Sequence, residues 1–200
     1  MRGVPPLDPE RSRALWRAAA SFGDLCELGA RFAEGAIEHF PGWGWPRLDA
    51  ESLELEADLA LLNRSGLLTT CSQPGRADDA REFAQRAFVS GFATATCIER
   101  LRAIERRPGL HFLVQEPDAL PGADLGECVP VTLERGLARV ELGGPAHAAE
   151  VACFEDDLRP ELLALLARTP IVTAWDERWG PSTALWSELR ALLREDADRR

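Results

Sequence analysis

The segment Leu61–Gly75, LLNRSGLLTTCSQPG, marks a point where a helix ends and a strand begins. Gly66 follows the last apolar residue of a helical pattern, where helices often end in a left-handed conformation. Leu67–Cys71 is apolar and rich in Thr, which is typical of a strand. Ser72–Gly75, SQPG, then has the composition of a turn. The segment therefore predicts hydroxyl groups and an amide gathered at the end of a strand.

A second strand is predicted at Ala87–Phe92, within the segment QRAFVSGF at 85–92, and its side chains would alternate between two faces. We expect this strand to pair with the strand of the first segment. Cross-strand neighbours have Cβ atoms ~5 Å apart, so Thr69 or Thr70 should lie beside Ser90 or Phe88.

Gly91 and Gln73 are the positions at which this pairing makes specific predictions. Gly91 lies inside the expected strand, where glycine usually marks a bulge or a close approach of another backbone. Gln73 is restrained by Pro74 and is expected on an exposed turn, with its amide free for a ligand. An exposed amide contributes little to folding, so Gln73→Ala is expected to leave the melting temperature nearly unchanged and to abolish binding.

Helical and strand patterns alternate irregularly along the rest of the chain. Three helices are expected before the first segment, starting near Pro9, Phe22 and Asp49, the second of them reaching Phe40. The later elements are expected in this order: a helix from Thr94, a strand at Leu110–Gln115, a hairpin of Val129–Glu134 and Leu137–Leu142, a helix at Asp156–Arg168, a strand at Ile171–Trp175, and a helix at Ser182–Arg194. This order predicts an α+β fold: one domain over residues 1–200, with amino-terminal helices packed on a mixed β-sheet, a hairpin and a carboxy-terminal helix.

Composition excludes several classes of partner. A net charge of −10 would repel a nucleic-acid backbone or an anionic membrane surface, so neither is an expected partner. The chain contains no apolar run near the ~20 residues of a membrane helix, and its first residues do not resemble a secretory signal. A cytoplasmic location is therefore expected.

Several kinds of chemistry are also excluded. The chain has no Lys and no Tyr, so Schiff-base chemistry and tyrosine nucleophiles are ruled out. Five cysteines without a Cys-x-x-Cys pair, and three histidines without close pairing, favour reduced thiols and no metal site. Cys71 has no histidine in a recognisable relation to it, so a thiol nucleophile is not favoured. We expect no cofactor.

Thr69, Thr70, Ser72 and Gln73 are the first group of candidate ligand-binding residues. Hydroxyls and an amide at a strand end suit a small polar ligand such as a sugar, nucleoside or amino acid. Ser90 joins this group through the expected strand pairing. The alternative is that Thr simply favours strands and that SQPG is only a turn.

A second group of candidates combines aromatic rings with a carboxylate. Trp43 lies in the loop Gly42–Pro46, GWGWP, and forms either a pocket wall or a core contact. Trp175 ends an apolar strand and Asp176 follows it, a place where loops often contact ligands, and Asp176 is the candidate acid-base residue. The alternative is a solvated charged loop with its Trp packed on the core.

The two central segments also resemble a known signature. Asn-Arg-x-Gly-Leu-x-Thr-x-x-Ser-Gln-Pro-Gly, beginning at Asn63, followed by Gln-Arg-Ala-Phe-Val-x-Gly-Phe, is similar to a family of uncharacterised actinobacterial proteins, a domain-of-unknown-function family. LWRAA at 15–19, DLCEL at 24–28 and PGWG at 41–44 resemble its amino-terminal half. The resemblance covers roughly the first half of the chain. It implies a bacterial cytoplasmic setting and no assigned activity.

Two functional interpretations remain open. The first is a cytosolic domain that binds a small polar metabolite or nucleoside-like ligand, with metal-independent catalysis by Asp176 left open. The second is an acidic protein-interaction module, antitoxin-like or accessory, whose surface covers a basic protein partner without catalysis.

Overall fold

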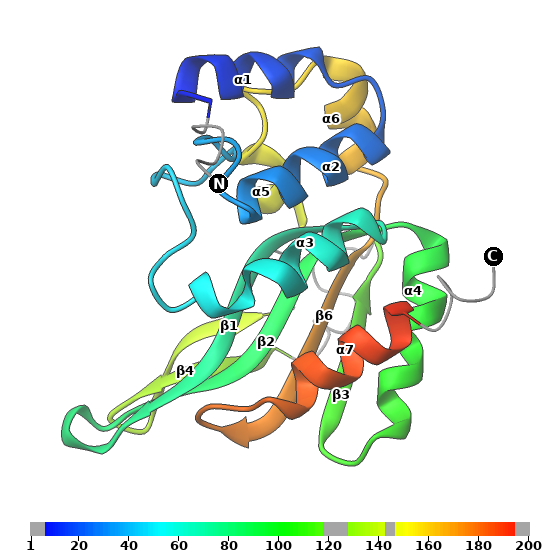
Figure 1. Ribbon diagram of the computed structural model, residues 1–200. Coiled ribbons are helices and arrows are strands. Elements are labelled where there is room, and N and C mark those ends of the chain that lie inside the picture. The colour runs from blue at the N-terminus through cyan, green and yellow to red at the C-terminus, as the bar shows by residue number, and fades with distance from the viewer. Residues whose placement is uncertain (1–6, 118–127, 143–146, 195–200) are drawn as a thin grey trace.

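The computed structural model describes residues 7–117, 128–142 and 147–194 (Figure 1). Helices and a six-stranded sheet make up this part of the chain, which confirms the predicted α+β class. The elements follow in this order: α1 (Pro9–Ala18), α2 (Phe22–Ala33), η1 (Leu53–Leu55), α3 (Glu56–Arg64), β1 (Leu67–Asp78), η2 (Asp79–Arg81), β2 (Phe83–Ala93), α4 (Ala95–Leu101), η3 (Arg102–Arg106), β3 (Leu110–Gln115), β4 (Val129–Glu134), β5 (Leu137–Leu142), α5 (His147–Ala152), α6 (Pro160–Leu166), β6 (Ile171–Trp179) and α7 (Ala184–Arg194). Within the described ranges, no helix is both long enough and apolar enough to cross a membrane.

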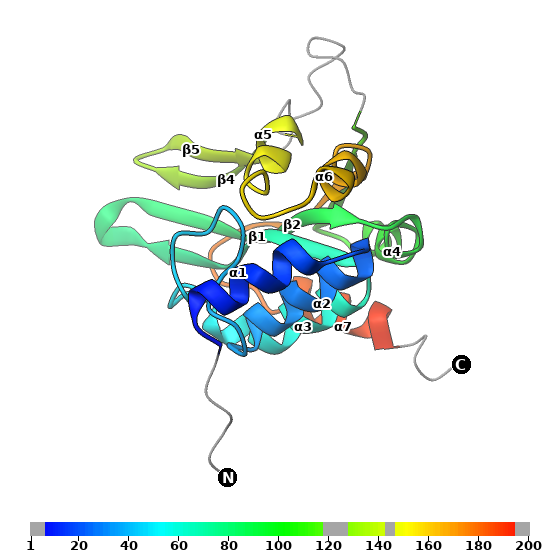
Figure 2. The same ribbon diagram turned by 90° about the horizontal axis from the view of Figure 1, so that it is seen from above.

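The hairpin of β1 and β2 is the centre of the sheet. β1 pairs with one edge of β2 along its length, so two other strands share the opposite edge. β6 pairs with Arg86–Phe92 of β2, and β4 pairs with Phe83–Gln85. β3 lies beyond β6 and β5 beyond β4, and Figure 2 shows that the β4–β5 hairpin projects toward the same end as the β1–β2 hairpin.

Every pairing within the sheet is antiparallel, whereas the sequence predicted a mixed sheet. Two of these pairings are hairpins with short connections, and a short connection can join only antiparallel strands. The helices therefore do not serve as crossovers between parallel neighbours. They are free to cover the sheet, and α3 and α7 lie side by side against it (Figure 1).

Two neighbouring residues of β1 separate the two main parts of the core. Side chains of consecutive strand residues point to opposite faces, so Leu67 and Leu68 enter different clusters. Leu67 packs with residues of α3, α4 and α7, among them Leu59, Leu101 and Leu189. Leu68 packs with residues of α1, α2 and α6, among them Trp16, Leu25 and Leu166.

The amino-terminal helices begin as their caps predict. The Asp8 side chain accepts from the backbone N–H of Arg11, and Ser21 with Asp24 forms a reciprocal capping box. The second helix, however, ends at Ala33 and does not reach Phe40. Gly35 adopts a φ of 68°, in the left-handed region that terminates helices.

The predicted SQPG turn is wrong, because residues 72–75 continue β1. The chain turns later, through η2, after which Glu82 takes a φ of 51°. Gly75 has a φ of 85°, and a Cβ there would collide with the carbonyl oxygen of Gly180. The glycine therefore allows two backbones to approach, a role that composition cannot distinguish from a turn.

Candidate functional site

A cavity of about 190 Å³ lies between α2, the segment before η1, β1 and α5. This volume is small for a ligand pocket, which suits a small molecule. Most of the wall is apolar, with polar groups drawn from three separate segments. The lining residues are Gly29, Phe32, Ala33, Phe40, Pro41, Gly42, Trp43, Leu48, Asp49, Ser52, Leu59, Thr69, Thr70, Cys71, Ser72, Gln73, Glu150, Cys153 and Phe154.

Aromatic rings form one wall of the cavity. The ring centroids of Phe32 and Phe40 lie 5.4 Å apart, and those of Phe40 and Phe154 lie 5.9 Å apart. Trp43 is partly exposed, and its indole Nε1 donates to the backbone oxygen of Arg47 at 3.0 Å. This bond holds the Trp43 loop in place, and the phenyl rings offer a dry surface to an apolar ligand group.

An irregularity in β1 brings several of its residues to the cavity together. The register with β2 shifts between Thr69, which lies opposite Gly91, and Cys71, which lies opposite Ser90. Thr70 is the extra residue of this bulge. Side chains of a regular strand would alternate between faces, whereas residues 69–73 all line the cavity.

This register confirms the predicted pairing of the two strands but changes the partners. Ser90 lies opposite Cys71 and not opposite a threonine, because the bulge consumes one residue. The prediction for Gly91 is confirmed, since a Cβ there would collide with the backbone carbonyl of Leu68.

Two polar atoms at the cavity have no hydrogen-bond partner within the described residues. They are Thr70 Oγ1 and Gln73 Oε1, and both are buried. Leaving such a group unsatisfied costs roughly 1–3 kcal/mol. Gln73 is thus not the exposed turn amide that the sequence predicted. The Thr69 hydroxyl, by contrast, accepts from Asn63 Nδ2 at 2.8 Å.

Glu150 is the main ionisable group at the cavity. Burial raises its pKa, and the Thr70 hydroxyl and the charge of His147 offset only part of this rise. The Thr70 hydroxyl lies near enough for this effect, although the two groups do not reach the geometry of a hydrogen bond. The second carboxylate, Asp49, accepts from the backbone N–H of Ser52 at 2.7 Å.

The thiols at the cavity are poor nucleophiles. Burial, with the nearby charges of Glu150 and Asp49, raises the pKa of Cys71 to about 11. Burial and Glu150 also raise the pKa of Cys153. The thiolate is the reactive form, so a raised pKa leaves both groups unreactive near neutral pH.

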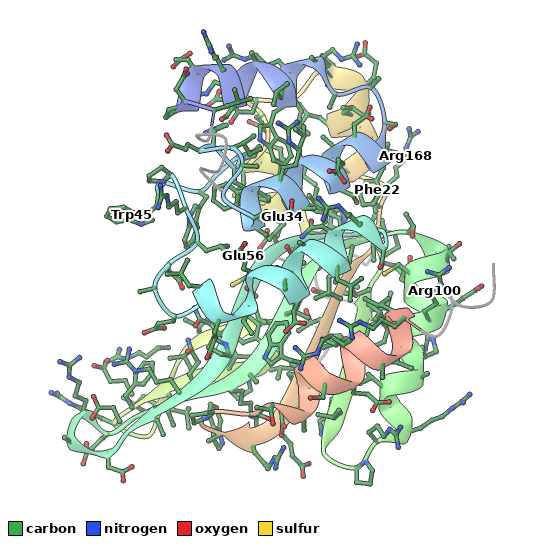
Figure 3. All side chains as sticks on the ribbon, in the orientation of Figure 1. Phe22, Glu34, Trp45, Glu56, Arg100 and Arg168 are labelled. Atoms are coloured by element: carbon green, nitrogen blue, oxygen red, sulfur yellow. The ribbon has the colours of Figure 1, made fainter. Side chains whose placement is uncertain are left out.

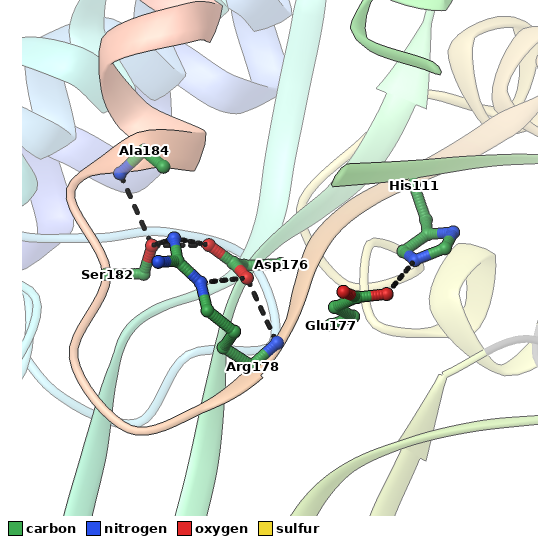
Figure 4. Close-up of polar contacts among 6 residues, drawn as sticks. All are labelled: His111, Asp176, Glu177, Arg178, Ser182 and Ala184. Carbon is green, nitrogen blue, oxygen red and sulfur yellow. Dashed lines mark hydrogen bonds and ion pairs between the residues drawn. The ribbon is translucent and has the colours of Figure 1, made fainter. Parts of the chain in front are cut away.

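Asp176 lies in a separate polar corner within β6 (Figure 4), which continues to Trp179 where the sequence predicted a loop after Trp175. Its carboxylate accepts from Arg178 at 2.7 and 3.0 Å and from the Ser182 hydroxyl at 2.5 Å. Burial alone would raise the pKa of Asp176, but these hydrogen bonds lower it to about 2. The Ser182 hydroxyl also accepts from Ala184 N at 3.3 Å, so this corner secures the start of α7.

Ser90 and Trp175 also lie away from the cavity. The Ser90 hydroxyl is buried, 2.9 Å from Thr173 Oγ1, and it donates to the Val172 carbonyl at 3.2 Å. Trp175 stacks on His111 with ring centroids 5.1 Å apart. Thr173 and Val172 belong to β6, and His111 belongs to β3, which pairs with β6. Both strands lie on the side of β2 opposite β1.

The structure therefore divides the predicted site. It brings together the first group of candidates except Ser90, and adds Trp43: Thr69, Thr70, Ser72, Gln73 and Trp43. Ser90, Trp175 and Asp176 do not join them. Trp175 and Asp176 lie on β6, which pairs with the edge of β2 opposite β1, and the Ser90 hydroxyl bonds to β6.

Sequence reasoning missed Asp49, Ser52, Glu150 and the phenyl wall. Glu150 lies on α5, a helix that was not predicted although HAAEVA, at 147–152, is rich in the helix former Ala. That composition was the available signal for the helix, but it carried no information about the cavity.

Comparison with protein families gives one result. The model of the family described as "Domain of unknown function (DUF6919)" matches residues 11–196. No curated protein matches the sequence. The match spans nearly the whole chain, including β1 and α5 of the cavity, and so extends well beyond the resemblance seen in the first half. The chain therefore belongs to the family of the domain of unknown function DUF6919.

Proposed function

We propose that this protein binds a small polar molecule, with an apolar portion, in the cavity between β1 and α5. The observation that carries the proposal is the pair of buried, unpartnered atoms, Thr70 Oγ1 and Gln73 Oε1, at the wall of that cavity. Native structures rarely leave buried polar atoms unsatisfied, and those that remain often mark functional positions. A bound molecule with hydrogen-bond donors would supply the missing partners.

Binding is the function that we propose, and catalysis is not required for it. Asp176 is unsuited to acid-base work, because its carboxylate is held ionised by Arg178 and lies outside the cavity lining. Glu150 takes its place as the acid-base candidate, since its raised pKa brings it closer to the operating range of such a group.

We also propose a bacterial, actinobacterial cytoplasmic setting. Cys26 and Cys97 are buried and unpaired, which suits a compartment that keeps thiols reduced. Their raised pKa values, about 12 for each because of burial, keep them protonated.

A thermal-shift screen with amines, sugars, nucleosides and amino acids tests the binding function. We expect a shift with at least one class, and we expect Gln73→Met to reduce that shift. Gln85→Met is the matched control: Gln85 Oε1 is also buried without a partner, but Gln85 does not line the cavity. No shift with any class, or a shift that the two variants reduce equally, would overturn the proposal.

A second candidate function is protein interaction, and exposed apolar side chains favour it. β5 is an edge strand of the described sheet, with Leu137 63% exposed and Val140 43% exposed. Trp45, 70% exposed, points outward from the loop before α3 (Figure 3). With a net charge of −10, a basic protein is the expected partner. Purification from the native host distinguishes the candidates: a stoichiometric complex that weakens with salt favours interaction.

A further inference from the structure

We propose that the cavity ligand is a small organic cation, with its positive group beside Asp49 and Glu150 and its apolar part on the phenyl wall. This inference rests on the proposed binding function and adds the charge class of the ligand. Three independent features of the cavity support it: its charge, its unsatisfied acceptors and its aromatic surface.

The charge of the cavity is one-sided. Two carboxylates, Asp49 and Glu150, line it from different segments, and the lining contains no Arg and no His. An anionic ligand, such as a phosphate or a carboxylate, would meet like charge in a partly desolvated site, and His147, whose charge acts on Glu150, lies outside the lining. A cation would meet opposite charge.

Glu150 differs from the buried carboxylates of the described residues. Each of those has an arginine partner: Asp58 pairs with Arg190 at 2.6 Å, Asp157 with Arg13 at 3.0 Å, and Asp176 with Arg178 at 2.7 Å. Glu150 is half-buried, and in the described part of the chain it makes no ion pair with an arginine. A ligand cation would take the place that an arginine holds beside the other carboxylates.

The unsatisfied atoms need donors. Gln73 Oε1 can only accept, and Thr70 Oγ1 can accept as well as donate. A primary ammonium group carries three N–H donors, enough for both oxygens and the Glu150 carboxylate. A ligand with acceptors only would leave Gln73 Oε1 unpaired.

The aromatic wall suits an organic cation more than a metal ion. The apolar part of an organic cation can pack on the rings of Phe32, Phe40 and Phe154, whereas a metal ion has no apolar part to place there. Ca²⁺ instead takes six to eight oxygen ligands, as a general rule. No group of three or more His, Cys, Asp or Glu residues able to hold a metal ion occurs in the parts of the chain described.

Three probes of one size separate the charge classes: benzylamine, benzyl alcohol and benzoate, measured by titration calorimetry at neutral pH. We expect benzylamine to bind at least tenfold more tightly than either of the others. We also expect Glu150→Gln to weaken benzylamine at least tenfold and to leave benzyl alcohol unchanged. Asp49→Asn is a second variant with the same expectation, because Asn retains the oxygen that accepts from Ser52.

Glu155→Gln is the matched control for net charge. Glu155 is exposed, lies five residues from Glu150 and is not a lining residue. Its replacement should leave benzylamine binding unchanged. Melting temperatures of all variants establish that each is folded.

The outcomes separate this inference from the binding function. Equal or tighter binding of benzyl alcohol or benzoate, or equal effects of Glu150→Gln and Glu155→Gln, would overturn the charge assignment alone. Absence of binding by all three probes would also overturn it. The binding function falls only on the two outcomes given for the wider thermal-shift screen: no shift with any class, or a shift that Gln73→Met and Gln85→Met reduce equally.

Discussion

Asn63 and Thr69 join the end of α3 to the start of β1 through a reciprocal pair of hydrogen bonds. Asn63 Nδ2 donates to Thr69 Oγ1 at 2.8 Å, and Thr69 N donates to Asn63 Oδ1 at 3.2 Å. Asn63 Nδ2 also donates to the Leu59 carbonyl at 2.8 Å. Gly29 of α2 lies so close that a Cβ there would collide with Asn63 Oδ1. One buried amide thus fixes the strand that carries the cavity's polar residues.

Asn63→Ala is expected to destabilise the protein by roughly 2–4 kcal/mol, because it removes three hydrogen bonds and leaves buried groups unpaired. Urea unfolding followed by circular dichroism measures this loss. Ser65→Ala is a nearby control, since the Ser65 side chain makes no hydrogen bond within the described residues. A loss below about 1 kcal/mol for Asn63→Ala would show that the amide is not a structural anchor.

Gly91→Ala tests the close approach of β1 to β2. The added Cβ would meet the Leu68 carbonyl, a backbone group that cannot move without disturbing the pairing. We expect a loss of at least about 2 kcal/mol, measured by the same unfolding method. Gly44→Ala is the matched control, because a Cβ there would lie in open space, and its effect should stay within about 0.5 kcal/mol. Similar losses for the two variants would contradict the close approach.

Local patterns predicted much of this fold because its caps and strands are local features. Asp8 and Ser21 cap α1 and α2 as expected, and Thr94 caps α4 by accepting from Cys97 N at 3.2 Å. One helix boundary was predicted wrongly. The helix expected from Asp156 starts at Pro160, because proline is favoured at the first position of a helix.

The set of residues that meet at the cavity depends on contacts between segments far apart in the sequence, which no local pattern predicts. Glu150 meets Thr70 across 80 positions of the chain, and β6 pairs with the edge of β2 that β1 leaves free. The bulge at Thr70 shifts the register by one residue, and five consecutive residues of β1, 69–73, line the cavity. A period-2 pattern predicts a strand but does not locate a bulge within it. The polar residues of β1 were therefore predictable, and their partners were not.

Asp176 should contribute to the pH dependence of stability. Its pKa of about 2 in the folded state lies below the ordinary 3.8, so its contribution is complete above about pH 5 and is lost as the pH falls through 3.8 toward 2. The full contribution is on the order of 2 kcal/mol. Unfolding free energies of the wild type and Asp176→Asn should differ by about this amount at pH 6 and converge at lower pH.

Asp156→Asn is the control for the change in net charge in that comparison. Asp156 is exposed and makes no ion pair in the part of the chain that is described. A constant difference between wild type and Asp176→Asn from pH 6 to pH 3 would show that Arg178 and Ser182 do not hold the Asp176 carboxylate in its charged form.

Gln73→Met separates a role in folding from a role in binding. Gln73 Oε1 is buried without a partner, so replacing the amide with an apolar side chain of similar size should leave stability unchanged or raise it by roughly 1 kcal/mol. Gln85→Met removes a second unpartnered oxygen, together with the 3.3 Å hydrogen bond from Gln85 Nε2 to Thr132 Oγ1. Because that bond is lost, Gln85→Met should be less stable than Gln73→Met. Only Gln73→Met should weaken benzylamine, by at least tenfold. A destabilisation of Gln73→Met above about 1 kcal/mol would show that the amide is a structural group, and the cavity would lose the acceptor on which ligand binding depends.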